Sequence, residues 1–111
     1  WKNKSQEKIL IRQWKREMMK FLPARAYENG VFVIAVNQAG KVPPGDELHC
    51  FPGTALVFSP FGDLMAETAG AASTEKMVVV TLDPKMLIAK RAEEHFFLRY
   101  RRPNLYKKIS E

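Results

Sequence analysis

The sequence predicts an α/β fold in which mixed or antiparallel strands are covered by helices. An amphipathic helical pattern over residues 5–22 precedes a run of six hydrophobic residues at 31–36. Further on, a proline-glycine turn at 60–63 separates two apolar segments. The run at 31–36 is too apolar for a strand with one wet face, so we expect a strand that is covered on both faces.

The N-terminal helix is predicted from large apolar residues at helical spacing. These residues are Ile11, Trp14, Met18 and Leu22. Pro23 removes a backbone donor, so it either kinks the helix or opens a short second helix that ends near Asn29. Gly30 then supplies the left-handed residue that stops the helix.

Four strands are predicted after this helix. The first covers residues 31–37 and leads into a loop at 38–49 that is long enough to be functional. Residues 53–59 and 64–68 form a hairpin around the turn at 60–63, because proline and glycine favour reversal of the chain. The valine-rich segment 76–82 is the fourth strand.

The C-terminal region is predicted as a helix followed by an extended tail. Asp83 is suited to cap a helix and Pro84 to occupy its first position, so the helix should run to about His95. Pro103 makes residues 99–111 an extended tail rather than a continuation of helix.

Length and composition indicate one globular domain rather than a disordered chain. The 111 residues suffice for one modest core, and 46% of them are hydrophobic. Because the chain begins at Trp1 with a helical pattern almost at once, we expect a fragment of a longer protein. No apolar run approaches the roughly 18 residues of a membrane span, so we expect a cytoplasmic protein without membrane contact.

The cysteine and histidine content argues against a metal site. Cys50 is the single cysteine, which excludes an intramolecular disulfide and agrees with a reducing compartment. The histidines, His49 and His95, lack the spacing of metal ligands. We therefore predict no metal and no cofactor.

The formal charge of +6 leaves two interpretations. Basic residues concentrate in the first helix and near the C-terminus, where they suit either a solvated helix face or an anionic partner such as nucleic acid. No glycine-rich phosphate loop or aromatic-basic RNA motif is present. The solvated face is therefore favoured, and nucleic acid is not the expected partner.

Four motifs in order resemble the nitrilase superfamily, the carbon-nitrogen hydrolases. The first is Arg25-Ala26-Tyr27-Glu28-Asn29-Gly30 with its following strand, and the others are Gly53-Thr54 with Ser59-Pro60-Phe61-Gly62, the helix opened by Asp83-Pro84, and Arg101-Arg102-Pro103-Asn104-Leu105-Tyr106. The resemblance covers residues 25–106. It implies that residues 1–111 are the C-terminal part of one four-layer αββα sandwich.

The resemblance also implies a chemistry and an assembly state. In such enzymes a cysteine thiolate attacks an amide or nitrile carbon of a small molecule, a glutamate moves protons and a lysine stabilises the developing charge. All three residues precede the Arg-Ala-x-Glu-Asn stretch, so no catalytic residue is assigned in this chain. The family usually assembles as dimers or larger oligomers, and we expect the same here.

The predicted substrate-binding residues are Asn37, Gly53 and Thr54. Asn37 follows a buried strand, where its amide either lines a pocket or caps a loop. Gly53 and Thr54 permit either a close approach to substrate or only a bulge. Arg25 and Glu28 lie three residues apart on a helix and suit structural pairing or support of the active site.

Cys50 is not the expected nucleophile. Adjacent residues of an extended segment point to opposite sides, so His49 is poorly placed to take its proton. The position of Cys50, just before Phe51, also differs from that of the family's nucleophile. Two hypotheses remain: the C-terminal part of a thiol-dependent hydrolase, inactive alone, or a complete noncatalytic basic α/β module that binds an anionic partner.

Overall fold

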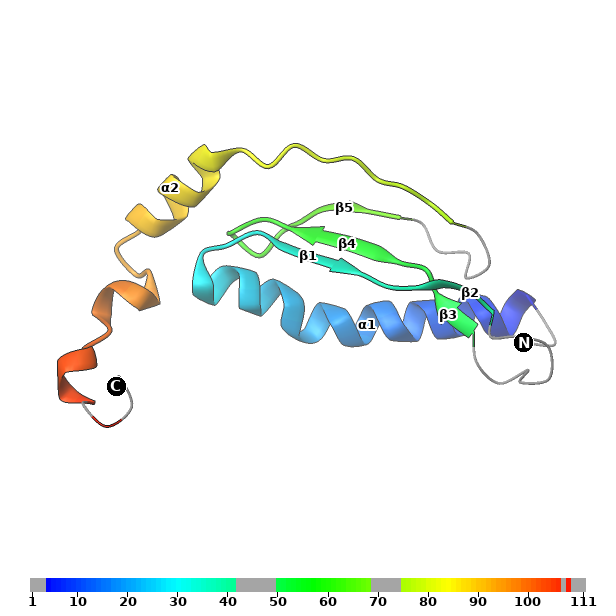
Figure 1. Ribbon diagram of the computed structural model, residues 1–111, viewed down its shortest axis with the longest axis horizontal. Helices are drawn as coiled ribbons and strands as arrows, with labels where there is room; N and C mark the ends of the chain where they lie inside the picture. The colour runs from blue at the N-terminus through cyan, green and yellow to red at the C-terminus, as the bar shows by residue number, and fades with distance from the viewer. Residues whose placement is uncertain (1–3, 42–49, 69–74, 107, 109–111) are drawn as a thin grey trace.

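A long helix, α1 (Lys4–Asn29), lies along one face of a small antiparallel sheet in the computed structural model of the chain (Figure 1). The structure describes residues 4–41, 50–68, 75–106 and 108. α1 continues through Pro23, so this proline does not open a separate second helix. The helix ends as predicted before Gly30, which adopts a φ of 56°.

The main sheet has three antiparallel strands in the order β1-β4-β5. These strands are β1 (Val33–Val36), β4 (Ala55–Phe58) and β5 (Leu64–Glu67). β4 and β5 form the predicted hairpin, with a register shift between Val57 and Phe58. The predicted strand at 31–37 is shorter than expected, because only its middle pairs with β4.

A second, two-stranded sheet continues from the first. It consists of β2 (Ala39–Lys41) and β3 (Cys50–Pro52), which pair antiparallel. Part of the segment predicted as a loop at 38–49 is therefore a strand, and residues 42–49 lie outside the described residues.

The core lies between α1 and the inner face of the main sheet. Ala26, Leu56 and Phe58 are buried there, surrounded by partly buried apolar side chains. These neighbours are Trp14, Met18, Leu22, Val33, Ala35 and Leu64. Burial of one large side chain of this kind contributes about 1.5–3 kcal/mol. The apolar face predicted for the first helix therefore provides the main attachment between helix and sheet.

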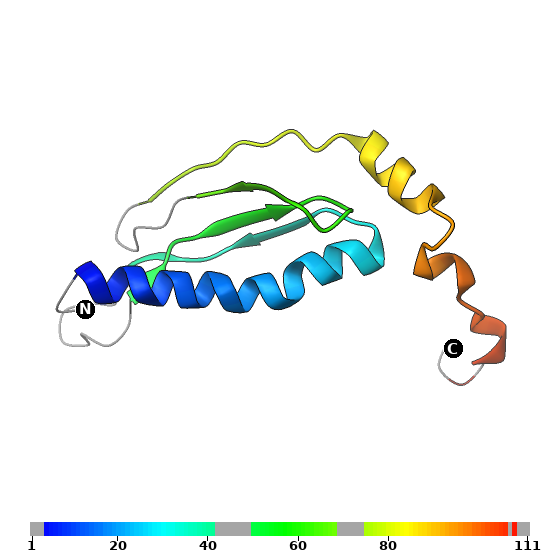
Figure 2. The ribbon, with the colours of Figure 1, turned by 180° about the vertical axis from the view of Figure 1, so that it is seen from behind.

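The outer face of the main sheet is much less covered. Ile34 and Val36 are 55% and 77% exposed, which follows from the alternation of side chains along β1. The prediction of a fourth strand at 76–82 is wrong, because none of these residues is in a strand. This segment instead passes the sheet as an extended strap, with Val78 half-buried and Val79 exposed (Figures 1 and 2).

The helix after the strap, α2 (Pro84–Ala92), begins as predicted. The Asp83 carboxylate accepts a hydrogen bond from the Lys85 backbone N–H at 2.9 Å, and Pro84 occupies the first turn. α2 stops at Ala92 instead of His95, because Glu93 leaves the helical region with φ −57° and ψ 140°.

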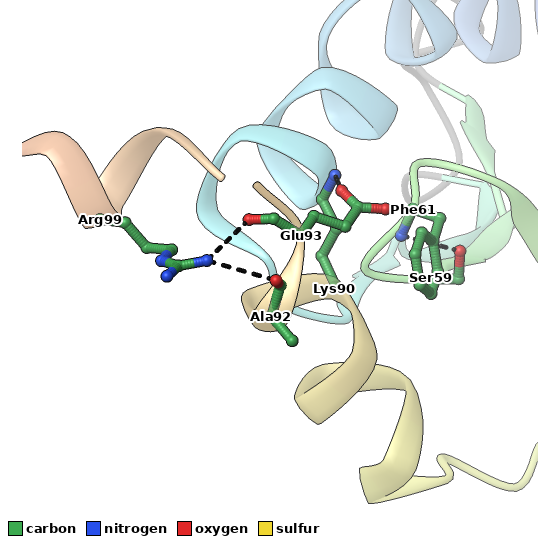
Figure 3. Close-up of polar contacts among 6 residues, drawn as sticks. All are labelled: Ser59, Phe61, Lys90, Ala92, Glu93 and Arg99. Carbon is green, nitrogen blue, oxygen red and sulfur yellow. Dashed lines mark hydrogen bonds and ion pairs between the residues drawn. The ribbon is translucent and has the colours of Figure 1, made fainter. Parts of the chain in front are cut away.

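The C-terminal tail is not simply extended as predicted. It contains two short 3-10 helices, η1 (Phe97–Tyr100) and η2 (Pro103–Leu105). Pro103 starts η2 because its fixed φ suits the first position of a helical turn. In addition, the Arg99 guanidinium donates to the carbonyls of Ala92 and Glu93, both at 3.2 Å, which folds η1 back toward α2 (Figure 3).

The α/β class with antiparallel strands and helices is thus confirmed, as one helix layer against one sheet layer. The chain measures 56 × 34 × 19 Å, and the segment from α2 to η2 extends beyond the end of the sheet (Figures 1 and 2). Among the described residues, none of the helices has both the length and the apolar character of a membrane span.

Candidate functional site

Asn37, Gly53 and Thr54 come together where β1 ends and β4 begins. The Asn37 backbone N–H donates to the Thr54 carbonyl at 3.2 Å, and the Gly53 N–H donates to the Gln38 carbonyl at 2.8 Å. These two hydrogen bonds continue the β1–β4 ladder toward the second sheet. The fold therefore brings all three predicted site residues into one cluster, although they are up to 17 positions apart in the sequence.

Gly53 allows the chain to change direction between β3 and β4. Its φ of 59° lies in the left-handed region, which glycine adopts without a steric penalty. This conformation lets its N–H reach Gln38 while Thr54 starts the next strand. The register irregularity of β4 lies between Val57 and Phe58 rather than at Gly53, and the close approach of a substrate to Gly53 stays a prediction.

The hydroxyl of Thr54 is buried rather than open to a ligand. Thr54 is only 2% exposed, and its Oγ1 donates to the Pro52 carbonyl at 3.2 Å. This side chain thus stabilises the turn that presents the cluster. Thr54 therefore has almost no exposed surface with which to contact a substrate.

Thr68 is a member of the cluster that the sequence analysis missed. Its Oγ1 accepts a hydrogen bond from the Ala55 N–H at 2.8 Å and donates to the Gly53 carbonyl at 3.4 Å. The side chain is buried, and its own N–H pairs with the Ala55 carbonyl at 3.0 Å. The sequence signal that could have identified Thr68 is its position directly after the second strand of the hairpin, opposite the start of the first strand.

Asn37 is the residue of the cluster that retains donor capacity. Its Oδ1 accepts a hydrogen bond from the Gln38 N–H at 2.7 Å, which fixes the side chain against the backbone. Across the described part of the chain, its Nδ2 makes no hydrogen bond. A half-buried amide with one fixed end and one open donor end is suited to orient a carbonyl or nitrile group.

Arg25 and Glu28 form a surface ion pair, with 3.6 Å between Nη1 and Oε2. Their side chains are 68% and 50% exposed, and the pair precedes β1 whereas Asn37 follows it. The structural pairing that was considered for these residues is therefore present, at the opposite end of β1 from the cluster.

Cys50 begins β3, opposite Lys41, while His49 lies outside the described residues. The prediction that Cys50 is not catalytic therefore stays a prediction. Within residues 4–41, 50–68 and 75–106, no group of three or more His, Cys, Asp or Glu side chains could hold a metal ion.

An apolar groove lies on the outer face of the main sheet. It has a volume of about 410 Å³. Its walls are the outward side chains of β1 and β4 and the strap, namely Ile34, Val36, Ala55, Val57 and residues 76–80. Aliphatic side chains predominate, so the groove offers packing surface rather than reactive groups.

Several basic residues of α1 have acidic neighbours. Lys15 pairs with Glu67 at 2.5 Å, and Lys20 pairs with Glu17 at 2.7 Å. These contacts favour the interpretation of the basic helix face as an ordinary solvated surface.

The sequence profile of the carbon-nitrogen hydrolase family matches residues 3–92, most of the chain. The chain belongs to this family. The resemblance drawn from its motifs is thereby confirmed, and the alternative of an unrelated noncatalytic basic module has no support. Comparison with curated proteins and with solved structures gave no match.

Proposed function

We propose that this chain is the C-terminal part of a thiol-dependent carbon-nitrogen hydrolase. The complete protein acts on a non-peptide amide, carbamoyl or nitrile bond of a small molecule, and its nucleophile precedes residue 1. The family match over residues 3–92 is the observation on which this proposal rests.

The exposed apolar side chains on the outer side of the sheet and strap support a further layer that this chain does not supply. Val36 is 77% exposed, and Met77 and Val79 on the strap are more than 80% exposed. Large apolar patches of this kind mark surfaces that pack against something else. A second sheet and its helix, from the preceding part of the protein, would complete a four-layer αββα sandwich.

Within the proposed enzyme, the strand-end cluster helps to shape the substrate pocket. The open Nδ2 donor of Asn37 would orient the oxygen or nitrogen of the scissile group, while Gly53 and Thr54 fix the backbone beside it. Thr68 holds this arrangement through its hydrogen bonds with Ala55 and Gly53. The thiolate attack and the proton transfers belong to the upstream cysteine, glutamate and lysine.

The proposed enzyme is a cytoplasmic homo-oligomer. A single cysteine suits a reducing compartment. Exposed tyrosines and arginines gather in and after η1, including Tyr100, Arg101 and Tyr106, and such residues are enriched in protein interfaces. The C-terminal segment is therefore the proposed contact between subunits.

Labelling of the reactive thiol tests the proposal. The full-length protein is treated with a substoichiometric amount of iodoacetamide, its amidase and nitrilase activities are followed by ammonia release, and the modified peptide is mapped. We expect inactivation to parallel labelling of an upstream cysteine, and Cys50→Ser to retain activity. Inactivation that parallels labelling of Cys50, together with an inactive C50S variant, would refute the assignment.

A further inference from the structure

Lys90 is the one buried charged residue in the described part of the chain, with 1% of its surface exposed. It comes from α2, but its ammonium group lies among side chains of three segments. The Nζ atom is 3.5 Å from the ring centroid of Tyr27 in α1 and 5.7 Å from that of Phe61 in the β4–β5 turn. It also donates to Glu93 Oε2 at 2.5 Å (Figure 3).

This environment compensates for the removal of the ammonium from water. A buried charge is tolerated when it has an ionic partner and favourable electrostatic contacts. Glu93 supplies the opposite charge, and the face of the Tyr27 ring supplies a cation–π contact at short range. The ammonium group is therefore held from two sides. Glu93 follows α2 directly, whereas the rings of Tyr27 and Phe61 belong to α1 and the β4–β5 turn.

The other contacts of this region converge on the same place. The Arg91 Nε donates to the Gly30 carbonyl at 3.2 Å. Phe96 is 6% exposed, and its ring lies against Gly30. The rings of Tyr27 and Phe97 form an edge-to-face pair with centroids 6.3 Å apart. All of these contacts involve the last turn of α1 or the glycine that ends it.

Before this anchor lies the strap, which lines the outer face of the main sheet, and after it lies the tail with η1 and η2. The strap before α2 pairs with no strand in the described residues. After the anchor, Tyr100 and Leu105 are 64% and 65% exposed. Residues 84–106, which we call the C-terminal arm, are therefore held against the body of the fold at one end of α1.

We propose that Tyr27, Phe61 and Glu93 form an intramolecular receptor for the Lys90 ammonium, and that this ion is the latch that docks the C-terminal arm. The role is independent of the hydrolase chemistry, since the latch and the Asn37 cluster lie at opposite ends of β1. Loss of the latch releases the arm while α1 and the main sheet stay folded.

Hydrogen exchange measured by mass spectrometry on the full-length protein tests the latch. In Lys90→Met, which keeps the length of the side chain but removes its charge, we expect amide exchange in residues 93–102 to rise about tenfold or more. Exchange in β4 should stay as in the wild type. Lys90→Arg should lose less protection, and Lys85→Met, at an exposed lysine of the same helix, should lose none.

Wild-type exchange of the arm in K90M would overturn the proposal. If K90M also loses protection in β4, two variants of Tyr27 decide the question. Tyr27→Phe keeps the aromatic face and should leave the arm protected, whereas Tyr27→Leu removes that face and should release the arm. Equal exchange of the arm in Y27F and Y27L would show that the aromatic receptor does not hold it.

Discussion

The ring of Phe96 occupies the space that a side chain on Gly30 would need. A Cβ atom added to Gly30 would lie 2.8 Å from Cε2 and 3.1 Å from Cζ of this ring. Gly30 also has a φ of 56°, so two separate constraints favour glycine at this position. The residue that ends α1 is thus also the residue on which the C-terminal arm rests.

Gly30→Ala should lower the free energy of unfolding by at least about 1–2 kcal/mol, the usual cost of a side chain in the left-handed region. The clash with Phe96 adds to this cost. Urea denaturation of the full-length protein measures it, and Phe96→Leu provides the control. Because leucine removes the clashing ring edge, G30A should cost less in the F96L background, and equal costs in both backgrounds would contradict the steric explanation.

Thr68→Val should destabilise the hairpin by about 1–3 kcal/mol, because the partly buried Ala55 N–H loses its acceptor. Valine has nearly the same shape as threonine, so little packing is lost. Thr68→Ser keeps the hydroxyl and should retain most of the stability in the same urea titration. A serine variant as unstable as the valine variant would point to packing by the methyl group instead.

Asn37→Asp separates the two functions considered for this residue. Aspartate keeps the oxygen that accepts the Gln38 N–H but loses the Nδ2 donor. If Asn37 orients the substrate, kcat/KM of the full-length enzyme should fall about tenfold or more, with a change in unfolding free energy below about 1 kcal/mol.

The matched control for N37D is Gln38→Glu, which makes the same change of charge at the exposed neighbouring position. This variant should keep its activity. Full activity in N37D would refute substrate orientation by Asn37 and would favour a role in loop capping alone.

Val36→Lys tests whether another layer covers the outer face of the sheet. A lysine at a position that is 77% exposed should be nearly neutral if the face stays in water. Under a second sheet it would be buried, at a cost of about 2 kcal/mol or more. We expect the larger loss in thermal or urea unfolding of the full-length protein.

Gln13→Lys, on the exposed side of α1, adds the same charge and serves as the control. Equal stability of V36K and Q13K in the full-length protein would contradict the four-layer arrangement.

Deletion of residues 99–111 tests the role of the C-terminal segment in assembly. Removal of Tyr100, Leu105 and Tyr106 takes away exposed aromatic and apolar surface, so light scattering of the full-length protein should show smaller oligomers. Truncation after Tyr106 keeps these side chains and should leave the molar mass unchanged. The same mass in both truncated proteins would refute a contact through this segment.

Local patterns were sufficient to predict most of the fold. Helical spacing predicted α1, and the turn residues around Pro60 and Gly62 predicted the β4–β5 hairpin, because both depend on neighbours in the sequence. The segment 76–82 was predicted as a strand from Val78, Val79 and Val80. Its extended shape agrees with that pattern, but sequence alone did not reveal that it joins none of the strands that the structure describes.

The sequence predicted which residues form the candidate site better than it predicted their contacts. Asn37, Gly53 and Thr54 were identified from strand ends and from a family motif. Backbone hydrogen bonds join Asn37 to Thr54 and Gly53 to Gln38. The inward hydroxyl of Thr54 and the contribution of Thr68 depend on the register of the hairpin. Burial of Lys90 was missed because lysine is usually exposed, although its spacing from Met86 and Leu87 places it on the same side of α2.

The exposed apolar side chains on the outer face of the sheet also bear on aggregation of the protein. Ile34 and Val36 are solvent-exposed and line the apolar groove on this face. In the full-length enzyme that we propose, a protease cut just ahead of α1 would release a piece with this apolar surface exposed to other copies, and we expect such pieces to aggregate. An uncut chain at the proposed junction would then limit aggregation as well as preserve the proposed activity.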